Sequence, residues 1–390
     1  MVVGSTHFGK IAAFVAIFLF TATLIRGPRQ SPSLDDTALV WVKKACAPTN
    51  CVLRDAEFSP HRASVLLTST RTNITALKAK DSPDANLVTV QYRKLSSTEM
   101  DKYEYRKGLF IYKEPYHLQN IGHVLGDDIF AICSSIFDRG LHNLSASDIW
   151  MILPSDFEKE ITRRSIIIQH YRLVSSNPIL FSRSQVKNTH RVVYENLLTG
   201  WDGYGYSMGH THGNFPTTEK VEAFRRRAFS LFDVKERETQ GRCNVLFLEK
   251  NIEIAHHKYS ISNIDELLAA LRAATTCTIE KVSWYGMSLR DQIAKMHDKN
   301  IVVSLPGSDL MNCIFQPTHS GMIVPDKCNE GGICTGSNEV GLWFARMPSR
   351  LVVTLPAVNS GLSWKGNRGV WNATHFVETV VRMNNLLHSR

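Results

Sequence analysis

The sequence predicts an α/β protein whose C-terminal half is a doubly wound parallel sheet. Apolar runs of strand length alternate there with amphipathic segments of helix length, a pattern typical of parallel sheets covered by helices. The chain has 390 residues, 43% of them hydrophobic, and can bury the core of one large or two medium domains. The expected strands are Val245–Leu248, Thr278–Trp284, Ile301–Leu305, Met322–Pro325 and Leu351–Leu355.

Helices are expected between and after these strands. Ser262–Ala274 and Ser288–His297 each begin with a serine followed three residues later by an aspartate, which is the pattern of a capping box. Two more helices, Asp309–Phe315 and Thr374–Leu387, complete the alternation. Helices that cover both faces of the strands are what a doubly wound sheet requires.

The first half is less regular and is expected to form a second α/β domain. A helix is predicted over Asn120–Phe137, where Asn120 can cap the first turn, and a strand over Ile149–Leu153. An apolar stripe marks one side of the predicted helix Thr218–Phe232, and three arginines are expected on its other faces: Arg225, Arg226 and Arg227. Shorter candidates are strands at Ala63–Thr68 and Leu87–Tyr92, and helices or strands at Arg164–Tyr171 and Arg191–Leu197.

One extended apolar run, Ile11–Ile25, stands close to the N-terminus. It is at the short end of the roughly 17 to 25 residues that a bilayer span needs. Two interpretations stay open: a transmembrane signal-anchor with residues 1–10 as a cytosolic tail, or a signal peptide that is removed. No small-x-small cleavage site is obvious, which favours the anchor. Residues 26–40 are rich in Pro, Ser, Gly and charge and are predicted to be a stem.

Glycosylation signals and cysteines indicate an oxidising, lumenal compartment. Three N-x-S/T sequons start at Asn73, Asn143 and Asn372. Local disulfides are expected where two cysteines bracket a short loop: Cys46 with Cys51, and Cys328 with Cys334. A further candidate pair is Cys243 with Cys277, and the expected buried thiols are Cys133 and Cys313.

The formal net charge of +9 suits anionic ligands such as phosphates or an acidic membrane surface. A soluble basic surface would have the same charge, so this observation leaves both readings open. The chain has no Lys/Arg run interleaved with aromatic residues and no zinc-finger spacing. Nucleic acid is therefore not expected as a partner.

The sharpest candidate site is the segment Ile301–Phe315, where an apolar strand runs through Pro-Gly-Ser-Asp into a helix. Ligands bind at the carboxyl ends of strands in open parallel sheets, and a helix start offers free N–H groups to a phosphate. Gly307 would let the backbone approach that phosphate closely. Alternatively, Ser308 or Asp309 simply caps the helix, and the negative charge of Asp309 favours the cap. The segment matches neither the P-loop nor the dinucleotide fingerprint.

A second candidate is the pair His123 and Asp127, which are four residues apart and share one face of a helix. An imidazole that a carboxylate holds in one tautomer is a plausible general base. The alternative is a histidine at a helix start whose hydrogen bond has only a structural role. The spacing alone favours the structural role.

A third candidate is the basic loop after Val245–Leu248, in which Lys250, His257 and Lys258 could neutralise a diphosphate or simply face solvent. The chain contains no D-x-D triplet. Enzymes that bind a nucleotide diphosphate through a metal usually need such a carboxylate pair. A metal-free site, built from a helix start and basic side chains, is therefore expected, with no bound cofactor.

Three segments together resemble glycosyltransferase family sixty-one. Val302–Phe315 is similar to the family hallmark V-V-S-x-x-G-x-x-L-x-N-x-I-F, and Asn120–Asp127 is similar to its N-x-x-H-x-x-x-D segment. Val245–Lys250 and the helix start at Asn263–Leu267 resemble its strand, basic loop and following helix. The matches occur in the family's order over about residues 110–325.

This resemblance implies a GT-B-like fold, in which two Rossmann-type domains face a cleft. Residues 41–235 would be the acceptor-side domain, residues 236–370 the nucleotide-sugar-binding domain, and residues 371–390 a C-terminal helix. It also implies inverting, metal-independent transfer of xylose, N-acetylglucosamine or arabinose from a nucleotide-sugar, expected to be UDP-linked, to a lumenal glycan or glycoprotein. The protein would be a single-pass type II protein of the Golgi or endoplasmic reticulum membrane.

The resemblance also implies roles for individual residues. His123 and Asp127 would line the cleft from the first domain, with His123 as the base and Asp127 or Asp128 as alternatives. The residues expected at or near the donor are Lys250, His257, Gly307, Ser308, Asp309, Asn312 and Asp326, the last of them as a ribose ligand. The segment Gly200–Phe215 is a candidate acceptor loop, because aromatic rings stack on sugar faces; it could also be an ordinary surface loop.

The chain departs from the family pattern at a few site positions: Pro306, Ser308, Asp309, His256 and His257. A non-catalytic lumenal carbohydrate-binding or scaffolding protein on the same fold is therefore a second hypothesis. A lumenal hydrolase is a third, although the chain has no G-x-S-x-G motif to support it.

Overall fold

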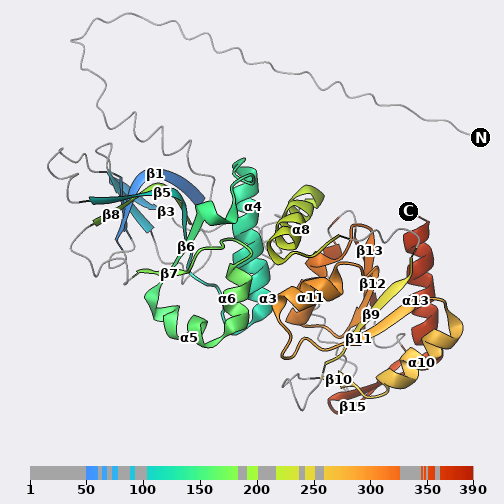
Figure 1. The fold of residues 1–390 in the computed structure, drawn as a ribbon. Helices are drawn as coiled ribbons and strands as arrows, with labels where there is room; N and C mark the ends of the chain where they lie inside the picture. The colour runs from blue at the N-terminus through green and yellow to red at the C-terminus, as the bar shows by residue number, and fades with distance from the viewer. Residues whose placement is uncertain are drawn as a thin grey trace, which may run out of the picture.

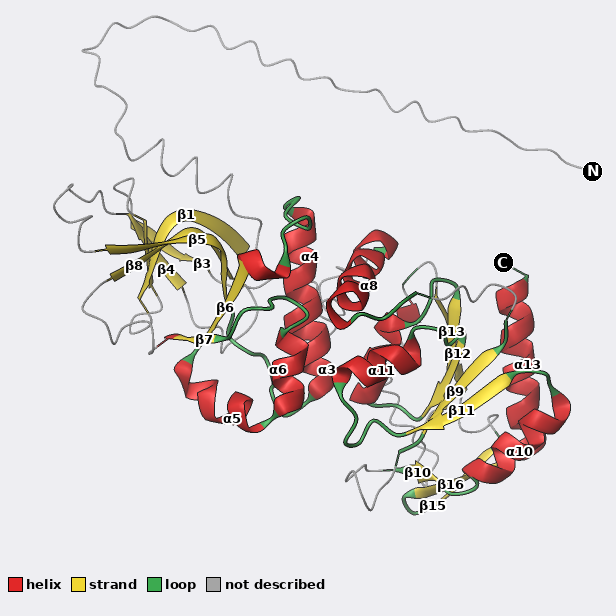
Figure 2. Cartoon of the chain, viewed as in Figure 1, coloured by secondary structure: helices red, strands yellow, loops and turns green. Residues whose placement is uncertain are grey.

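The described residues form two large sheets with a layer of helices between them, and one small sheet (Figures 1 and 2). The computed structural model describes residues 50–59, 64–67, 73–77, 88–92, 103–182, 191–200, 217–236, 242–250, 259–325, 344–345, 347, 350–355 and 361–389. The N-terminal sheet has eight strands and the C-terminal sheet has five. The mixed α/β class with parallel sheets is thus confirmed.

The eight-stranded sheet is mixed, with the strand order β3-β4-β2-β1-β8-β5-β6-β7. Its parallel part is formed by β8 (Arg191–Gly200), β5 (Tyr103–Tyr112), β6 (Ile149–Leu153) and β7 (Leu180–Phe181). β1 (Asn50–Ser59) runs antiparallel to β8 and extends the sheet to β2 (Ser64–Leu67), β4 (Val88–Tyr92) and β3 (Asn73–Leu77). Only the parallel part has the strand arrangement of a Rossmann-type sheet, and the antiparallel extension departs from it.

The helix expected over 120–137 is one continuous element with a π-helical middle. It consists of α3 (Ile121–His123), the π-helix η1 (Val124–Phe130) and α4 (Ala131–Asp138), and the Asn120 side chain caps it as predicted. The two ambiguous segments are resolved as a helix, α6 (Ser165–Tyr171), and a strand, β8. Short helices fill the connections: η2 (Ala146–Asp148), η3 (Ser155–Phe157) and α5 (Glu158–Arg163).

The five-stranded sheet confirms the predicted parallel arrangement. Its order is β11 (Thr278–Val282), β9 (Asn244–Leu248), β12 (Ile301–Ser304), β13 (Ser320–Pro325) and β14 (Arg350–Leu355), all parallel. Alternate strand residues pack on opposite faces: Val245 and Val303 contact α10 (Ile264–Ala274) and α13 (Ala373–His388), while Leu246 and Val302 belong to the other core. α11 (Leu289–Met296) and η5 (Ser308–Phe315) cover this second face. Helices therefore cover both faces of the sheet.

A small sheet beside α10 was not predicted. β10 (Ser260–Ile261), β16 (Arg368–Trp371) and β15 (Leu362–Lys365) form it. It explains a wrong expectation about the start of α10. The N-cap residue is Asn263, whose side chain makes no cap hydrogen bond. The predicted capping box at Ser262 does not form, because the Ser262 hydroxyl donates to the carbonyl of Gly369 in β16. The capping box of Ser288 and Asp291 at α11 is confirmed.

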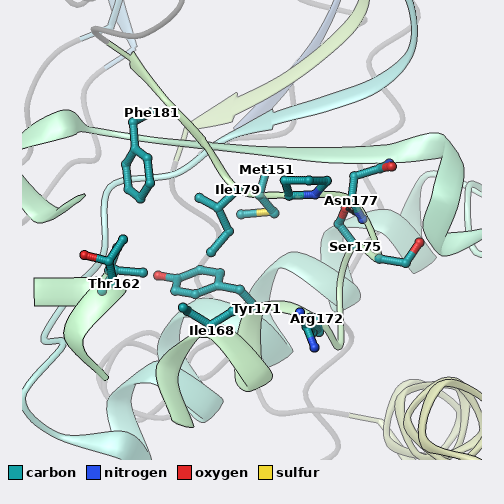
Figure 3. A pocket seen from close by; sticks show the side chains of 12 residues that line it. Met151, Thr162, Ile168, Tyr171, Arg172, Ser175, Asn177, Ile179 and Phe181 are labelled. Carbon is teal, nitrogen blue, oxygen red and sulfur yellow. Dashed lines mark hydrogen bonds between the residues drawn. The ribbon is translucent and has the colours of Figure 1, made fainter. Parts of the chain in front are cut away.

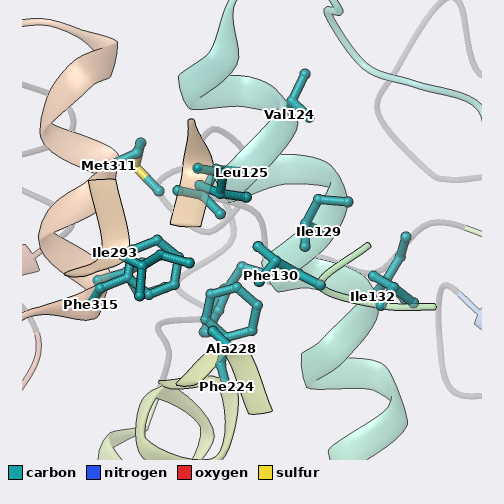
Figure 4. Packing of buried hydrophobic residues seen from close by; sticks show 14 of the residues in the cluster. Val124, Leu125, Ile129, Phe130, Ile132, Phe224, Ala228, Ile293, Met311 and Phe315 are labelled. Atoms are coloured by element: carbon teal, nitrogen blue, oxygen red, sulfur yellow. The ribbon is translucent and has the colours of Figure 1, made fainter. Parts of the chain in front are cut away.

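One apolar core joins the two halves (Figure 4). α8 (Thr218–Phe232) lies between them. The ring of Phe224 stacks on Phe315 at 5.8 Å and meets Phe130 edge to face at 5.5 Å, both between centroids. Arg225, expected on another face of α8 than the apolar stripe, is buried. Its side chain is 2% exposed and pairs with Glu222, because α8 packs against both halves.

The structure confirms the predicted Cys243–Cys277 pair and the buried thiol Cys313, whereas Cys133, expected to be buried, is only half-buried. Cys243 and Cys277 form a disulfide between the starts of β9 and β11, while Cys133 and Cys313 are free thiols, and Cys313 is buried. Cys46, Cys328, Cys334 and the Cys51 side chain lie outside the described residues.

Residues 1–49, which include the predicted tail, anchor and stem, lie outside the described residues. Among the helices that are described, none combines the length and apolarity needed to cross a bilayer. The boundaries at 41–235, 236–370 and 371–390 stay predictions, although α13 packs into the same core as α10 and β9.

Candidate active site

The candidate site lies where the carboxyl ends of strands from both sheets approach each other. His123 follows β5 through a short loop, Lys250 follows β9, and Gly307 follows β12. Backbone N–H groups and side chains at such strand ends are free to meet a ligand. The sequence patterns identified these three positions separately, and the fold brings their elements together.

The closest approach between the two halves at this site is at Gly122 and Ser308. A Cβ built on Gly122 would lie 2.6 Å from the Ser308 Cβ and 2.9 Å from its Cα, closer than real Cβ atoms come. Glycine at position 122 therefore lets α3 contact the start of η5. This contact places His123, the next residue, beside the predicted donor segment of the other half.

His123 and Asp127 form the predicted pair. His123 Nδ1 and Asp127 Oδ2 are 2.7 Å apart, and the Asp127 side chain is fully buried while that of His123 is 17% exposed. A carboxylate can only accept, so it holds the proton on Nδ1 and makes Nε2 the nitrogen that carries the lone pair. The geometry is that of an oriented general base.

Asp128, the neighbouring carboxyl, is buried behind this pair. The Tyr116 backbone N–H donates to Asp128 Oδ1 at 3.1 Å, Lys113 Nζ lies 3.6 Å from the same oxygen, and the Tyr171 hydroxyl donates to Oδ2 at 3.4 Å. Burial raises the pKa of the Asp128 carboxyl to about 6, against the opposing effect of Lys113. With 0% exposure, Asp128 cannot contact an acceptor, which disfavours it as an alternative base.

On the other half, Lys250 is folded over the turn at Gly307. Its Nζ donates to the Pro306 carbonyl at 2.8 Å and lies 3.6 Å from Asp309 Oδ2. Burial lowers the pKa of the Lys250 ammonium, and Asp309 opposes this shift. Gly307 has φ +154°, and a Cβ at this position would collide with Lys250 Nζ. Glycine is thus required for the close approach.

The start of η5 differs from the expected cap. η5 is a 3-10 helix whose N-cap is Gly307, and no side chain caps it. The expectation that Ser308 or Asp309 caps this helix is therefore wrong. Asp309 instead directs its carboxylate toward Lys250 and accepts a hydrogen bond at its carbonyl from Trp284 Nε1 at 3.3 Å.

Asn312 lies deeper than the other predicted donor residues. Its side chain is 3% exposed and donates to Gln292 Oε1 at 2.8 Å. Asn312 therefore links η5 to α11 in the interior, and its side chain does not reach the surface of the site. His256, His257, Asp326 and residues 201–215 of the predicted acceptor loop lie outside the described residues.

Sequence reasoning missed the aromatic residues that surround His123. The Tyr116 ring lies 5.1 Å from the His123 ring and the His117 ring 5.4 Å from it, between centroids. Both belong to the loop between β5 and α3. In the sequence, their position in the turn just before the predicted helix could have indicated that these two rings lie close to His123.

A separate cavity of about 290 Å³ lies behind α6 (Figure 3). Apolar side chains from β6, α6 and β7 line most of it, among them Met151, Ile168, Tyr171 and Phe181. None of the predicted site residues lines this cavity. One of the lining residues, Tyr171, donates its hydroxyl to Asp128.

Within the described part of the chain, no three His, Cys, Asp or Glu residues lie in an arrangement that could hold a metal ion. Metal independence stays a prediction from the missing D-x-D triplet.

Comparison with known proteins adds a family. The family model described as Glycosyltransferase 61 matches residues 163–323. No curated protein matches the chain. A similar solved structure is the dodecameric iron-containing heptosyltransferase TibC in complex with ADP-D-beta-D-heptose, with 11% identity over 82% of this chain and 84% of that chain and a TM-score of 0.29. A TM-score this low supports no argument.

Proposed function

We propose that this protein, whose residues 163–323 match the Glycosyltransferase 61 model, is a glycosyltransferase that moves a sugar from a nucleotide-sugar to a glycan or glycoprotein with inversion and without a metal. The proposed donor is UDP-linked xylose, N-acetylglucosamine or arabinose. The proposed arrangement is GT-B-like, with the acceptor bound by the N-terminal half and the donor by the C-terminal half.

The observation that carries this proposal is the contact of Gly122 with Ser308. Through this contact, α3 of one half, which carries His123, lies against the start of η5 of the other half, just after β12. Inverting transfer needs such a pairing, because the base and the leaving group must lie on opposite sides of the anomeric carbon. The family match begins at residue 163. It therefore includes the donor side of this pairing and does not include His123.

In the proposed reaction, His123 Nε2 takes the proton from an acceptor hydroxyl while Asp127 keeps the ring in one tautomer. The acceptor oxygen forms a bond to the anomeric carbon. The bond from that carbon to the diphosphate oxygen breaks, and its electron pair leaves with the nucleotide diphosphate.

The leaving diphosphate would be stabilised by the N–H groups at the start of η5 and by Lys250. Lys250 suits this role because its ammonium is already desolvated and fixed over Gly307. Asp309 holds the ammonium there in the absence of an anion, and donor binding would draw Lys250 toward the phosphates.

The anchor at 11–25 and the stem at 26–40 extend the proposal to a cellular setting. We place the catalytic body in the lumen of the Golgi or endoplasmic reticulum, among glycoprotein acceptors. The sequons and the Cys243–Cys277 disulfide support this placement, since disulfides persist in oxidising compartments.

The first test is thermal unfolding in the presence of UDP-sugars and GDP-sugars. We expect one nucleotide-sugar to raise the unfolding temperature, because a ligand of the native state stabilises it by mass action. The Lys250→Met variant is the matched comparison and should lose most of that shift. No stabilisation at millimolar concentrations of any donor would favour a non-catalytic carbohydrate-binding protein instead.

A further inference from the structure

We infer that Tyr116 is a platform on which a sugar ring of the acceptor stacks beside His123, and that Asp128 holds this platform in place. The inference rests on the proposed function, in that the acceptor is the glycan whose hydroxyl His123 deprotonates. It assigns an acceptor subsite to the loop between β5 and α3.

Tyr116 is exposed where an acceptor would have to bind. Among the described residues, Tyr116 is one of the few large hydrophobic residues with substantial exposure, and its exposed fraction is 44%. Its ring is tilted by 59° to that of His123, at 5.1 Å between centroids. An exposed aromatic face beside a proposed base offers a surface for the C–H groups of a pyranose, because the negative ring face attracts their partial positive charge.

The platform is anchored from below by a buried charge. The Tyr116 N–H donates to Asp128 at 3.1 Å, and Asp128 is 0% exposed. Hydrogen bonds to an ionised carboxylate are about twice as strong as neutral ones. Lys113, at the start of the same loop, lies 3.6 Å from Asp128, so one carboxylate fixes the loop at two points.

Other contacts hold the loop from a second helix. Arg164 donates to the Leu118 carbonyl at 2.6 Å, and the Tyr171 hydroxyl donates to Asp128. The loop is thus bonded to α6 as well as to η1. A binding residue on a loop is precise only when such contacts fix it, which is the requirement for stacking a sugar next to a base.

The test is saturation-transfer NMR with four methyl glycosides as probes: those of xylose, N-acetylglucosamine, galactose and mannose. We expect at least one to receive saturation from the wild-type protein on the C–H protons of one ring face. The Tyr116→Phe variant keeps the aromatic face and should keep the signal. Tyr116→Leu should weaken binding by about threefold to tenfold, the range of an aromatic contact.

Two variants complete the experiment. Asp128→Asn should reduce the same signal, since the anchor loses its charge while the Tyr116 ring stays in the chain. Leu386→Ala removes an exposed apolar side chain on α13 and should leave the signal unchanged. Circular dichroism of each variant shows whether it is folded. If Asp128→Asn alone is not folded, the double variant Lys113→Met/Asp128→Asn takes its place, because it also removes the lysine that faces this carboxylate.

The outcomes separate this inference from the proposed function. A glycoside signal that is equal in wild type and Tyr116→Leu, or absent for all four probes, overturns the platform even if UDP-sugars stabilise the protein. A signal that depends on Tyr116, in a protein that no nucleotide-sugar stabilises, supports the platform and contradicts the transferase.

Discussion

Gly122 lies against Ser308 so closely that an added Cβ would be 2.6 Å from the Ser308 Cβ. The two residues belong to different halves of the molecule, α3 and η5. Their contact is the point at which the sequence-predicted base and the sequence-predicted donor segment meet. The absence of a side chain at position 122 therefore determines the geometry of the whole candidate site.

The first prediction concerns this contact. Gly122→Ala should lower the free energy of unfolding by about 1 to 3 kcal/mol, because overpacking forces the Ser308 backbone to shift. Transfer should fall further than stability explains, since the base moves relative to the donor. The double variant Gly122→Ala/Ser308→Gly removes the facing Cβ and should recover part of both losses. Chemical denaturation and initial rates measure this cycle, and purely additive effects would contradict the contact.

The second prediction concerns Lys250. Lys250→Met should weaken nucleotide-sugar binding by about ten- to hundred-fold, the range for losing hydrogen bonds to a charged group. The variant removes the Lys250 ammonium from beside Asp309, so Lys250→Met/Asp309→Asn, which also removes the charge of Asp309, is the control. Isothermal titration of each variant with the stabilising donor gives the affinities. Equal affinity in wild type and both variants would remove Lys250 from the donor site.

The sequence predicted the parallel sheet well because its signal is local. Apolar runs such as 301–304 and cap residues such as Asn120 and Ser288 act within a few residues of themselves. The exact bounds of α8 also agree with the prediction, because Thr217 caps it and Asp233 ends it in the left-handed conformation.

What the sequence could not predict depends on distant partners. Nothing near Arg225 shows that α8 would be covered on both sides, and nothing near Ser262 shows that Gly369 would take its hydroxyl. The same holds for the site: spacing indicated His123 with Asp127 within one helix, but neither the approach to Ser308 nor the anchoring of Tyr116 by Asp128 is visible without the fold.

The third prediction concerns pH. Burial raises the pKa of Asp128 from 3.8 to about 6, while Lys113, Asp127 and Tyr171 are the charged and titratable groups around it. Between these two values the unfolded chain ionises this carboxyl and the folded protein keeps it protonated. Stability contributed by the group is therefore complete below about pH 4 and is lost as the pH rises to about 6, by on the order of 1 to 3 kcal/mol.

Asp128→Asn removes this dependence. Denaturation of wild type and Asp128→Asn across this range should show a difference in unfolding free energy that changes between pH 4 and 6 and is constant above pH 6.5. Asp148→Asn, at an exposed carboxyl, is the control. A pH-independent difference for Asp128→Asn would contradict a buried carboxyl with a raised pKa.

The most direct test of the account is the turnover of His123→Ala, measured as sugar transfer from the stabilising donor. Losing a general base should lower kcat by about 10²- to 10⁴-fold, with donor affinity unchanged because Lys250 and Gly307 remain. Circular dichroism controls for folding. A folded His123→Ala protein with wild-type turnover would contradict the proposal that His123 is the base and that the two halves form one transfer site.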